Sequence, residues 1–330
     1  MSPSDCVKNT KNQFTKMKNQ QQDNDLGLGN QLTGGYRMVD KNGNFRVKRK
    51  GAFVWHPYNS LLKMSWFKFH VIIFAFYTIV NAIFAFIYVE IGENALSGLY
   101  FSSFFPQYTK SFFFSVQTLT TVGYGAISPN CFWSNTVAAV EALIGLLIFA
   151  LVTGLYYAKF TRPKARILYS TKMLFSPYKD GINGLMFRMV NQRSSQLIDL
   201  EVQVTFSWVE PTQSGTLTRR FQSLTLERSK VMLFPLNFTV VHPISLESLL
   251  YGKNIEDMKA MNAEFLVFVK AHDVDFGQQV QSTVSYQWQD MEWAKKFIPM
   301  YYADESEGSV LDLEKISETV DMPLAPYNLK

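Results

Sequence analysis

Hydrophobic residues of this chain are concentrated in two long runs within its first half. One run extends from Trp66 to Tyr88 and the other from Phe132 to Phe160, and each contains only two charged residues or fewer. Both exceed the roughly 20 residues that an α-helix needs to cross a lipid bilayer. We therefore predict two transmembrane helices, at 66–90 and 132–160.

A third apolar segment lies between these runs and is too short to span a bilayer. Phe112 to Thr120 is typical of a short helix, and Ser128-Pro129-Asn130 then interrupts the chain. Non-helical backbone at membrane depth is tolerated only where it lines a polar cavity or is buried in protein. The order therefore predicts a re-entrant helix and an irregular segment at 107–125 that lines such a cavity.

After Arg166 the pattern changes to short apolar runs separated by turn signals. About seven such runs predict an antiparallel β-sandwich at 167–320, followed by a tail at 321–330. The glycines at 181 and 184 lie in a hairpin rather than at the start of a helix, so no nucleotide-binding fold is indicated. The principal runs are Ile167–Phe175, Leu185–Val190, Ile198–Phe206, Arg219–Leu226, Phe238–Val241 and Glu264–Val269.

The beginning of the chain is polar. Residues 1–35 are rich in Lys, Asn, Gln and Gly, which predicts a disordered arm rather than a signal peptide. Residues 36–56 form a further polar segment with a short strand around the Asn42-Gly43 turn. Pro57 then begins a segment at 57–65 whose apolar spacing predicts a helix on the membrane surface. The alternative is that this segment is only the start of the first transmembrane helix.

Basic residues flank the two apolar runs on one side of the membrane. Between Glu90 and Cys131 the only basic residue is Lys110, which by the positive-inside rule predicts that both termini are cytoplasmic. The flanking residues are Arg37, Lys41, Arg46, Lys48, Arg49 and Lys50 before the first run, and Lys159, Arg162, Lys164 and Arg166 at the end of the second.

Overall composition hides this membrane region. The chain is 47% hydrophobic and 15% aromatic, and its mean hydropathy of −0.03 would suit a soluble protein. Its net charge of +5 is concentrated beside the membrane, which favours anionic lipid headgroups over nucleic acid as partners. The two cysteines do not indicate a disulfide framework. The four histidines are scattered and no Gly-x-Ser-x-Gly turn occurs, so the sequence predicts no enzyme and no cofactor.

The irregular segment contains Thr121-Val122-Gly123-Tyr124-Gly125. Backbone carbonyls of such a segment, contributed by four subunits, can replace the hydration shell of K⁺. They can face one axis only if ordinary and left-handed dihedrals alternate, which explains Gly123 and Gly125. The motif alone also occurs in ordinary turns, but its position favours a potassium-selective filter, with K⁺ bound by Thr121, Val122, Gly123 and Tyr124. The alternative is a non-conducting, membrane-tethered binding module on the same scaffold.

Over Arg37 to Val320 the chain resembles the inward-rectifier potassium channels, particularly their prokaryotic branch. The resemblance implies a homotetramer with a central pore, an interfacial slide helix and an immunoglobulin-like cytoplasmic domain. It rests on the filter, Ala158-Lys159-Phe160-Thr161-Arg162-Pro163-Lys164, Phe238-Thr239-Val240-Val241-His242-Pro243-Ile244 with Leu250-Tyr251-Gly252, and Ser285-Tyr286 followed by Trp293.

The resemblance also implies a gate at Tyr157, with Phe149 and Thr153 lining the pore; the alternative for Tyr157 is an aromatic anchor at the membrane interface. Phe149 and Lys270 occupy positions where strongly rectifying relatives place acids that hold intracellular polyamines or Mg²⁺. We therefore expect weak rectification, with Asp273 and Asp275 as partial replacements. The corresponding cytoplasmic constriction is Ala271, His272, Asp273, Val274, Asp275, Phe276 and Gly277.

Many eukaryotic relatives brace the filter with a Glu and an Arg, whose places are taken here by Gln117 and Ile127. Loss of both leaves no lone buried charge. Glu141, behind the filter, is predicted to brace it instead; the alternative is a polar residue that reaches the outer interface. Gly145 corresponds to the family's hinge, although glycine equally permits close helix packing.

Basic residues near the inner surface are predicted to bind phosphoinositide or other anionic lipid headgroups, each contributing about 1 kcal/mol. The alternative is that their charge only sets the topology. The predicted residues are Lys63, Lys159, Arg162, Lys164 and Arg166.

Overall fold

The computed structural model describes residues 27–31, 34–40, 43–48, 50–51, 56–98, 104–161, 165–212, 214–304, 306 and 308–326. The chain divides into two compact units, one of residues 50–162 and one of residues 1–49 with 163–330. Most of the predicted arm, the last four residues of the predicted tail, and the predicted lipid ligands Arg162 and Lys164 lie outside the described residues.

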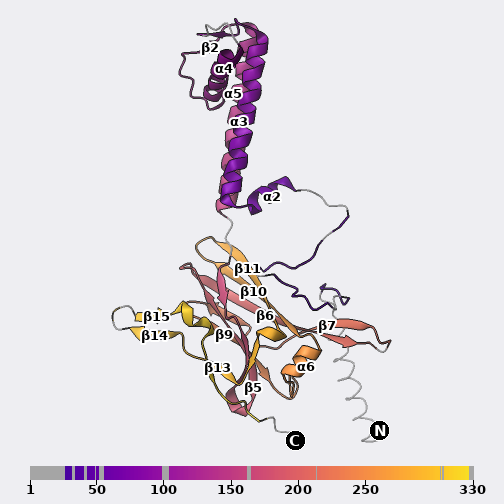
Figure 1. Cartoon of the computed structure of the whole chain (residues 1–330). Helices are drawn as coiled ribbons and strands as arrows, with labels where there is room; N and C mark the ends of the chain where they lie inside the picture. Colours follow the sequence, from indigo (N-terminus) through magenta and orange to yellow (C-terminus); the bar gives the residue numbers. More distant parts are fainter. Residues whose placement is uncertain are drawn as a thin grey trace, which may run out of the picture. The chain divides into compact units, whose positions relative to one another are not determined.

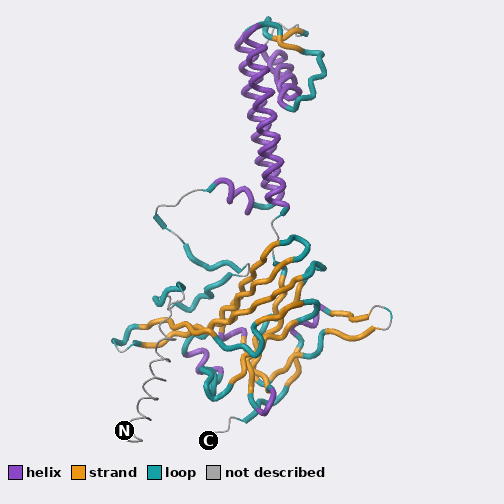
Figure 2. Tube along the Cα trace, turned by 180° about the vertical axis from the view of Figure 1, so that it is seen from behind, coloured by secondary structure: helices purple, strands orange, loops and turns teal. Residues whose placement is uncertain are grey.

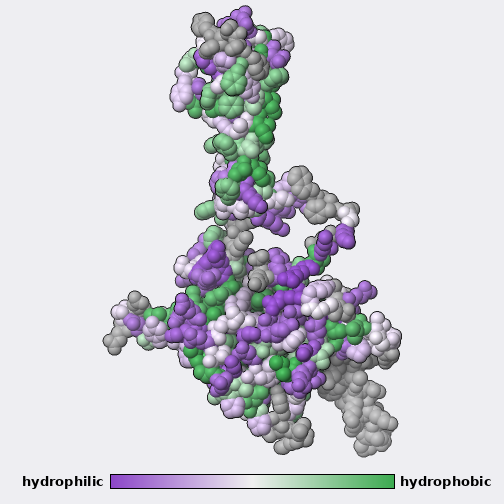
Figure 3. Space-filling model, in the orientation of Figure 1, coloured by the Kyte–Doolittle hydropathy of each residue, from purple (hydrophilic) through white to green (hydrophobic). Residues whose placement is uncertain are grey.

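The first unit is helical. Helix α2 (Pro57–Lys63) precedes α3 (Trp66–Ile91), and α4 (Phe104–Leu119) precedes α5 (Phe132–Phe160). Both α3 and α5 are long and apolar enough to cross a membrane. Figure 1 shows them side by side, with the shorter α4 against one end of the pair, and Figure 3 shows the hydrophobic surface that they carry.

Local sequence determines where these helices begin and end. Pro57 occupies the first turn of α2, where its missing N–H costs nothing. The Ser65 side chain accepts a hydrogen bond from the Lys68 N–H, and Cys131 forms a capping box with Ser134 at the start of α5. The loop after α3 and the loop after the filter segment are joined by a short two-stranded sheet of β1 (Leu96–Ser97) and β2 (Ser128–Pro129).

The second unit is a β-sandwich. Among the described residues the strands of its two large sheets have the orders β11-β10-β6-β7, with β8 on β6, and β12-β4-β5-β3, with β9 on β5. Figure 2 shows that strands dominate this unit. The bounds are β3 (Ile167–Tyr169), β4 (Met173–Pro177), β5 (Asn183–Asn191), β6 (Leu197–Pro211), β7 (Leu217–Ser223), β8 (Lys230–Leu233), β9 (Phe238–Ile244), β10 (Glu264–Asp273), β11 (Gln278–Gln287) and β12 (Met291–Trp293).

Smaller elements complete this unit. Strand β13 pairs with β16 and β14 pairs with β15, and both pairs are antiparallel. Their bounds, with those of the last short helix, are α6 (Ile255–Ala260), β13 (Lys295–Phe297), β14 (Tyr301–Asp304), β15 (Gly308–Leu311) and β16 (Thr319–Asp321).

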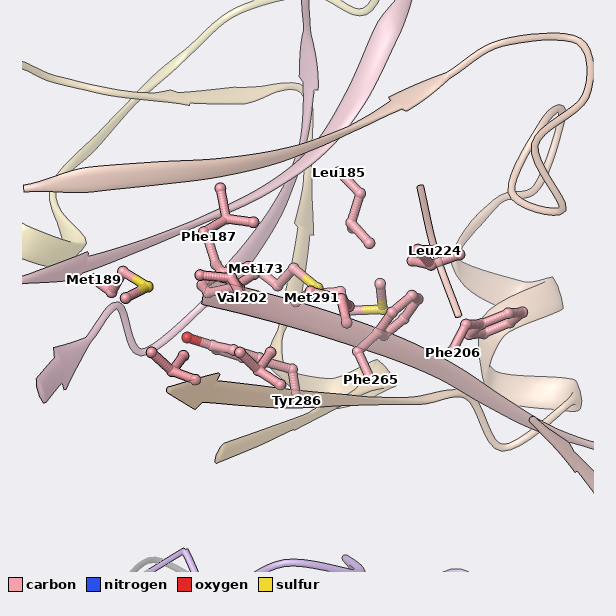
Figure 4. Close-up of a cluster of buried hydrophobic side chains, with 14 of the residues drawn as sticks. Met173, Leu185, Phe187, Met189, Val202, Phe206, Leu224, Phe265, Tyr286 and Met291 are labelled. Carbon is pink, nitrogen blue, oxygen red and sulfur yellow. The ribbon is translucent and has the colours of Figure 1, made fainter. Parts of the chain in front are cut away.

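The core of the sandwich lies between its two large sheets. Figure 4 shows Met173 and Phe187 from one sheet facing Val202, Phe206 and Phe265 from the other. These side chains are almost completely buried. Their burial provides the main hydrophobic stabilisation of this unit.

The described sandwich unit contains more strands than the roughly seven that the sequence predicts, and two of the differences have a clear physical cause. The predicted strand Ile167–Phe175 is interrupted at Ser170, whose backbone N–H donates to the Arg188 carbonyl and whose side-chain oxygen accepts the Arg188 N–H. Strand β11 was not predicted from the sequence, because Gln278–Gln287 is rich in polar residues and shows no apolar run. Pairing with β10 along ten positions nevertheless makes it a long strand.

The N-terminal segment contacts the sandwich. Val39 and Phe45 form an isolated bridge, and the Met38 N–H donates to Glu264 Oε1 at 2.9 Å. Glu264 in turn lies 3.9 Å from Arg219, and both side chains are only 1% exposed. Burial raises the pKa of Glu264 and lowers that of Arg219, so this pair is retained at a desolvation cost.

His242 is a buried histidine of the sandwich with a partner at each ring nitrogen. Its Nδ1 donates to the Thr225 carbonyl at 2.7 Å, and its Nε2 lies 2.7 Å from the Ser248 hydroxyl, from which the neutral ring can accept a hydrogen bond. Burial lowers its pKa. A depressed histidine pKa means that the unfolded state binds the extra proton, so stability is lost as pH falls below about 6.5.

We expect His242→Gln to reduce this pH dependence, because an amide can donate to Thr225 and accept from Ser248 without titrating. Thermal unfolding at pH 7.5 and 5.5 measures this pH dependence. Between these two pH values the free energy of unfolding of the wild type should fall by about 1 kcal/mol more than that of the variant. An equal loss in both proteins would contradict the assignment.

Candidate functional site

The backbone of the filter segment alternates between two conformations. Thr121, Gly123 and Gly125 have φ of 61°, 54° and 81°, whereas Val122 and Tyr124 between them do not have positive φ. The Val122 and Gly123 N–H groups both donate to the Gln117 carbonyl, at 2.9 and 3.3 Å. The segment is therefore anchored to the end of α4 with alternating dihedrals, as carbonyls directed at a common axis require.

Conformation, rather than space, accounts for the filter glycines. A Cβ built on Gly123 or Gly125 meets nothing within 4 Å in the subunit, but a left-handed backbone costs an L-residue about 1–2 kcal/mol. Thr121 adopts this conformation without being glycine, which is a local strain of the kind found at functional sites.

Behind the filter, Glu141 lies in a cluster of buried polar side chains from three helices. Its Oε2 accepts from the Tyr88 hydroxyl at 2.6 Å, and its Oε1 contacts the Ser115 hydroxyl. Ser115 also lies 3.0 Å from Asn81 Oδ1. The cluster therefore joins α3, α4 and α5. Its member on α4, Ser115, lies two residues before Gln117, whose carbonyl anchors the filter.

Gly145 lies where α5 passes the end of α4. A Cβ at this position would collide with the Leu119 carbonyl oxygen and would lie 2.9 Å from its carbonyl carbon. The backbone φ of Gly145 is not positive, so what demands a glycine in this structure is the close approach of the Leu119 backbone.

Three predicted pore residues share one side of α5. Phe149, Thr153 and Tyr157 recur every four positions and are exposed in the subunit, Phe149 at 72% and Tyr157 at 71%. Side chains at this spacing lie above one another on a helix. Lys159, two residues after Tyr157, is buried.

Lys159 interacts within the helical unit. Its ammonium donates to the carbonyls of Leu62 and Met64, at 3.2 and 2.7 Å, and lies 5.1 Å from the centre of the Trp66 ring. It thus caps the end of α2 and attaches it to α5. By contrast, Lys63 in this unit and Arg166 in the sandwich unit are exposed.

The predicted cytoplasmic constriction is the connection from β10 to β11. Ala271 to Asp273 belong to β10, and 274–277 form the turn. Asp273 is buried and accepts hydrogen bonds from the Asp275 and Phe276 N–H groups, at 3.1 and 3.4 Å. Asp273 therefore stabilises the turn, while Asp275 is exposed.

Comparison with known proteins decides the family. Residues 167–330 match the inward rectifier potassium channel C-terminal domain, and residues 72–162 match a family described as ion channel. The chain is also 35% identical to the inward rectifier potassium channel Kirbac3.1 of Paramagnetospirillum magnetotacticum, over 86% of this chain and 95% of that protein. This chain belongs to the inward rectifier potassium channel family.

More distant inward rectifiers occur in animals. The chain is 27% identical to inward rectifier potassium channel 4 of Homo sapiens, over 66% of this chain and 50% of that protein. It is 26% identical to inward rectifier potassium channel irk-1 of Caenorhabditis elegans, over 60% of this chain and 38% of that protein. The chain spans half or less of these animal relatives.

Several sequence predictions are thereby confirmed. The fold is that of an inward rectifier, with two membrane helices, a re-entrant pore helix with the filter, and an immunoglobulin-like β-sandwich domain. The family consists of membrane ion channels rather than enzymes, and its permeant ion is K⁺. Its members are tetramers that interact with lipids.

The partners of Glu141 and of Gly145 were not predicted from the sequence. Asn81, Ser115 and Tyr88 were given no role. Rare polar residues in membrane helices generally find partners in the protein interior, so their presence in all three helices was a usable signal. No comparable signal marks Leu119, because it contributes a backbone carbonyl.

Proposed function

We propose that this chain forms a homotetrameric potassium channel whose filter is Thr121 to Gly125. The alternating φ values of this segment are the observation that carries the proposal, since they are the conformation that directs successive carbonyls to one side. In the proposal K⁺ is bound by the carbonyls of Thr121, Val122, Gly123 and Tyr124.

Rubidium flux into liposomes that contain the purified protein tests the proposal. We expect rubidium uptake that barium blocks, and no comparable uptake of sodium. A tetramer without barium-sensitive flux under every lipid condition would instead favour the alternative, a non-conducting binding module on a channel scaffold.

We further propose that both termini are cytoplasmic and that Tyr157 forms the inner gate. Four aromatic rings at one level can close an axis by excluding water. The exposure of Tyr157 on the same side of α5 as Phe149 supports this role. An interfacial anchor would instead place this ring against lipid headgroups.

The proposed channel rectifies weakly, because acids are missing from both predicted blocking positions. Phe149 is apolar, and the Lys270 ammonium lies 5.5 Å from the centre of the Phe268 ring in the second position. Asp273 is engaged in the turn, which leaves Asp275 as the exposed acid of the loop. Polyamines or Mg²⁺ are accordingly proposed as weak blockers.

Phe149→Asp is expected to strengthen block by internal spermine about tenfold or more, since four carboxylates would attract the polycation, and 1.4 kcal/mol corresponds to a factor of ten. Concentration dependence of block in a planar bilayer measures the change. Phe149→Asn is the matched uncharged control and should leave block near that of the wild type. Equal block in all three would contradict a pore-facing Phe149.

We also propose that anionic lipid regulates the channel through basic residues at the inner membrane surface. Exposed Lys63 and Arg166 are available to headgroups, whereas Lys159 is bound to backbone carbonyls and acts by positioning α2. The proposed set also includes Arg162 and Lys164, outside the described residues.

Lys63→Gln and Lys159→Gln should therefore have different effects. Lys63→Gln is expected to weaken the response of flux to anionic lipid about fivefold, the loss of about 1 kcal/mol. Lys159→Gln should change flux in neutral and anionic liposomes alike, because α2 loses its cap. Identical lipid titrations for the two variants would contradict this division.

A further inference from the structure

In the buried cluster around Glu141, the donor and the acceptor of each hydrogen bond follow from the number of protons that the side chains carry. Asn81, Ser115 and Glu141 are completely buried, and Tyr88 is 1% exposed. Each must satisfy its polar atoms within the protein, because an unpaired buried donor or acceptor is costly. The partners of Glu141 are two neutral hydroxyls.

The orientation of Asn81 is set first. Its Nδ2 donates to the Tyr77 backbone carbonyl at 2.8 Å, and a carbonyl can only accept. Asn81 Oδ1 therefore faces Ser115, 3.0 Å from its hydroxyl oxygen, and is itself an acceptor.

Ser115 then faces two acceptors with one proton. Its hydroxyl oxygen contacts both Asn81 Oδ1 and Glu141 Oε1. If Glu141 were a carboxylate, one of these contacts would hold two oxygens together with no proton between them. A proton on Oε2 would not help, because Tyr88 already supplies the hydrogen bond there and Ser115 would still face two acceptors.

We infer that Glu141 is a neutral carboxylic acid protonated on Oε1. The acid donates to Ser115, Ser115 donates to Asn81, Asn81 donates to the Tyr77 carbonyl, and Tyr88 donates to Oε2. Every contact then has one donor and one acceptor. No charge is left in the membrane interior, where an uncompensated carboxylate is expensive.

The neutral acid is a positioning residue for the filter. It joins α5 to Ser115 on the pore helix and to Tyr88 on α3, and Ser115 lies two residues before the carbonyl of Gln117 that holds Val122 and Gly123. This consequence for conduction rests on the proposed function, whereas the protonation state does not. A glutamine at this position would preserve the pattern, because its amide donates to Ser115 and its oxygen accepts from Tyr88.

Infrared spectroscopy of the purified full-length protein at neutral pH tests the protonation. We expect the C=O stretching band of a buried carboxylic acid, and its loss in Glu141→Gln. Glu264→Gln is the matched control and should retain the band. Tyr88→Phe should shift the band to higher frequency, because the carbonyl oxygen of the acid loses its hydrogen bond.

Flux tests the positioning role separately. Glu141→Gln should conduct within about twofold of wild type, while Glu141→Ala, which removes the hydrogen-bond partner of the Tyr88 and Ser115 hydroxyls, should lose at least about tenfold in flux. A missing band in the wild type, or a band unchanged in Glu141→Gln, would overturn the inference. So would loss of flux in Glu141→Gln from a conducting parent. A wild type with the band but no flux would contradict the channel while supporting the neutral acid.

Discussion

Replacing Gly145 by alanine is expected to abolish potassium-selective flux. The added methyl group would collide with the backbone carbonyl of Leu119, at the end of the pore helix, and would lie 2.9 and 3.1 Å from the carbonyl carbon and Cα of that residue. Backbone at this point cannot move aside independently, because the filter begins two residues later at Thr121. Overpacking of a close contact typically costs about 1–3 kcal/mol. In a symmetric channel this cost would recur in every subunit.

Gly154→Ala is the matched control in the same helix. A Cβ at Gly154 meets nothing within 4 Å in the subunit, and alanine favours the helix over glycine by about 1 kcal/mol. This variant should therefore keep selective flux.

The ratio of rubidium to sodium flux, measured with size-exclusion chromatography as a check on the tetramer, separates packing from a hinge. If Gly145 were needed only for bending, Gly145→Ala would conduct less but with normal selectivity. Damage to the filter would instead reduce both selectivity and barium block. Normal flux and selectivity in Gly145→Ala would show that the contact with Leu119 relaxes without consequence.

Gly123→Asp is expected to eliminate selective flux while leaving the tetramer intact. Gly123 has φ of 54°, which an L-residue adopts at a cost of about 1–2 kcal/mol, and the substitution places a carboxylate in a ring of K⁺-binding carbonyls. The open space around its Cβ allows the subunit itself to fold.

Gly215→Asp separates the backbone cost from the effect on the filter. Gly215 has φ of 78° and equally open surroundings, but it lies in the turn between β6 and β7. Its variant should conduct as the wild type does. Selective flux through Gly123→Asp would mean that the conducting segment lies elsewhere in the chain.

The sequence alone predicted those features that depend on the surrounding lipid or on the conformation of a single residue. The bilayer demands helices of sufficient length, so the apolar runs predicted α3 and α5. Strand β11 escaped notice because its ten residues are recruited by pairing with β10 rather than by their own apolar pattern. Ser170 interrupts a predicted strand through hydrogen bonds to Arg188, eighteen residues away, which periodicity does not encode.

The two glycines illustrate where sequence reasoning ends. Gly123 is required by its own dihedral angles, and the need for a left-handed conformation can be deduced from the motif because conformation is a local property of each residue. Gly145 is approached by a carbonyl from another helix, and this contact with Leu119 could be found only in the tertiary structure.

The same distinction applies to the charged residues. Sequence alone established that Glu141 and Lys159 were unusual in a membrane helix, because a charge is costly there wherever it lies. Only the tertiary structure assigned their partners, Ser115 and Tyr88 for the acid and the carbonyls of α2 for the lysine. These partners lie 26 to 97 residues away along the chain. Such contacts depend on how separate helices pack, which no local pattern of residues specifies.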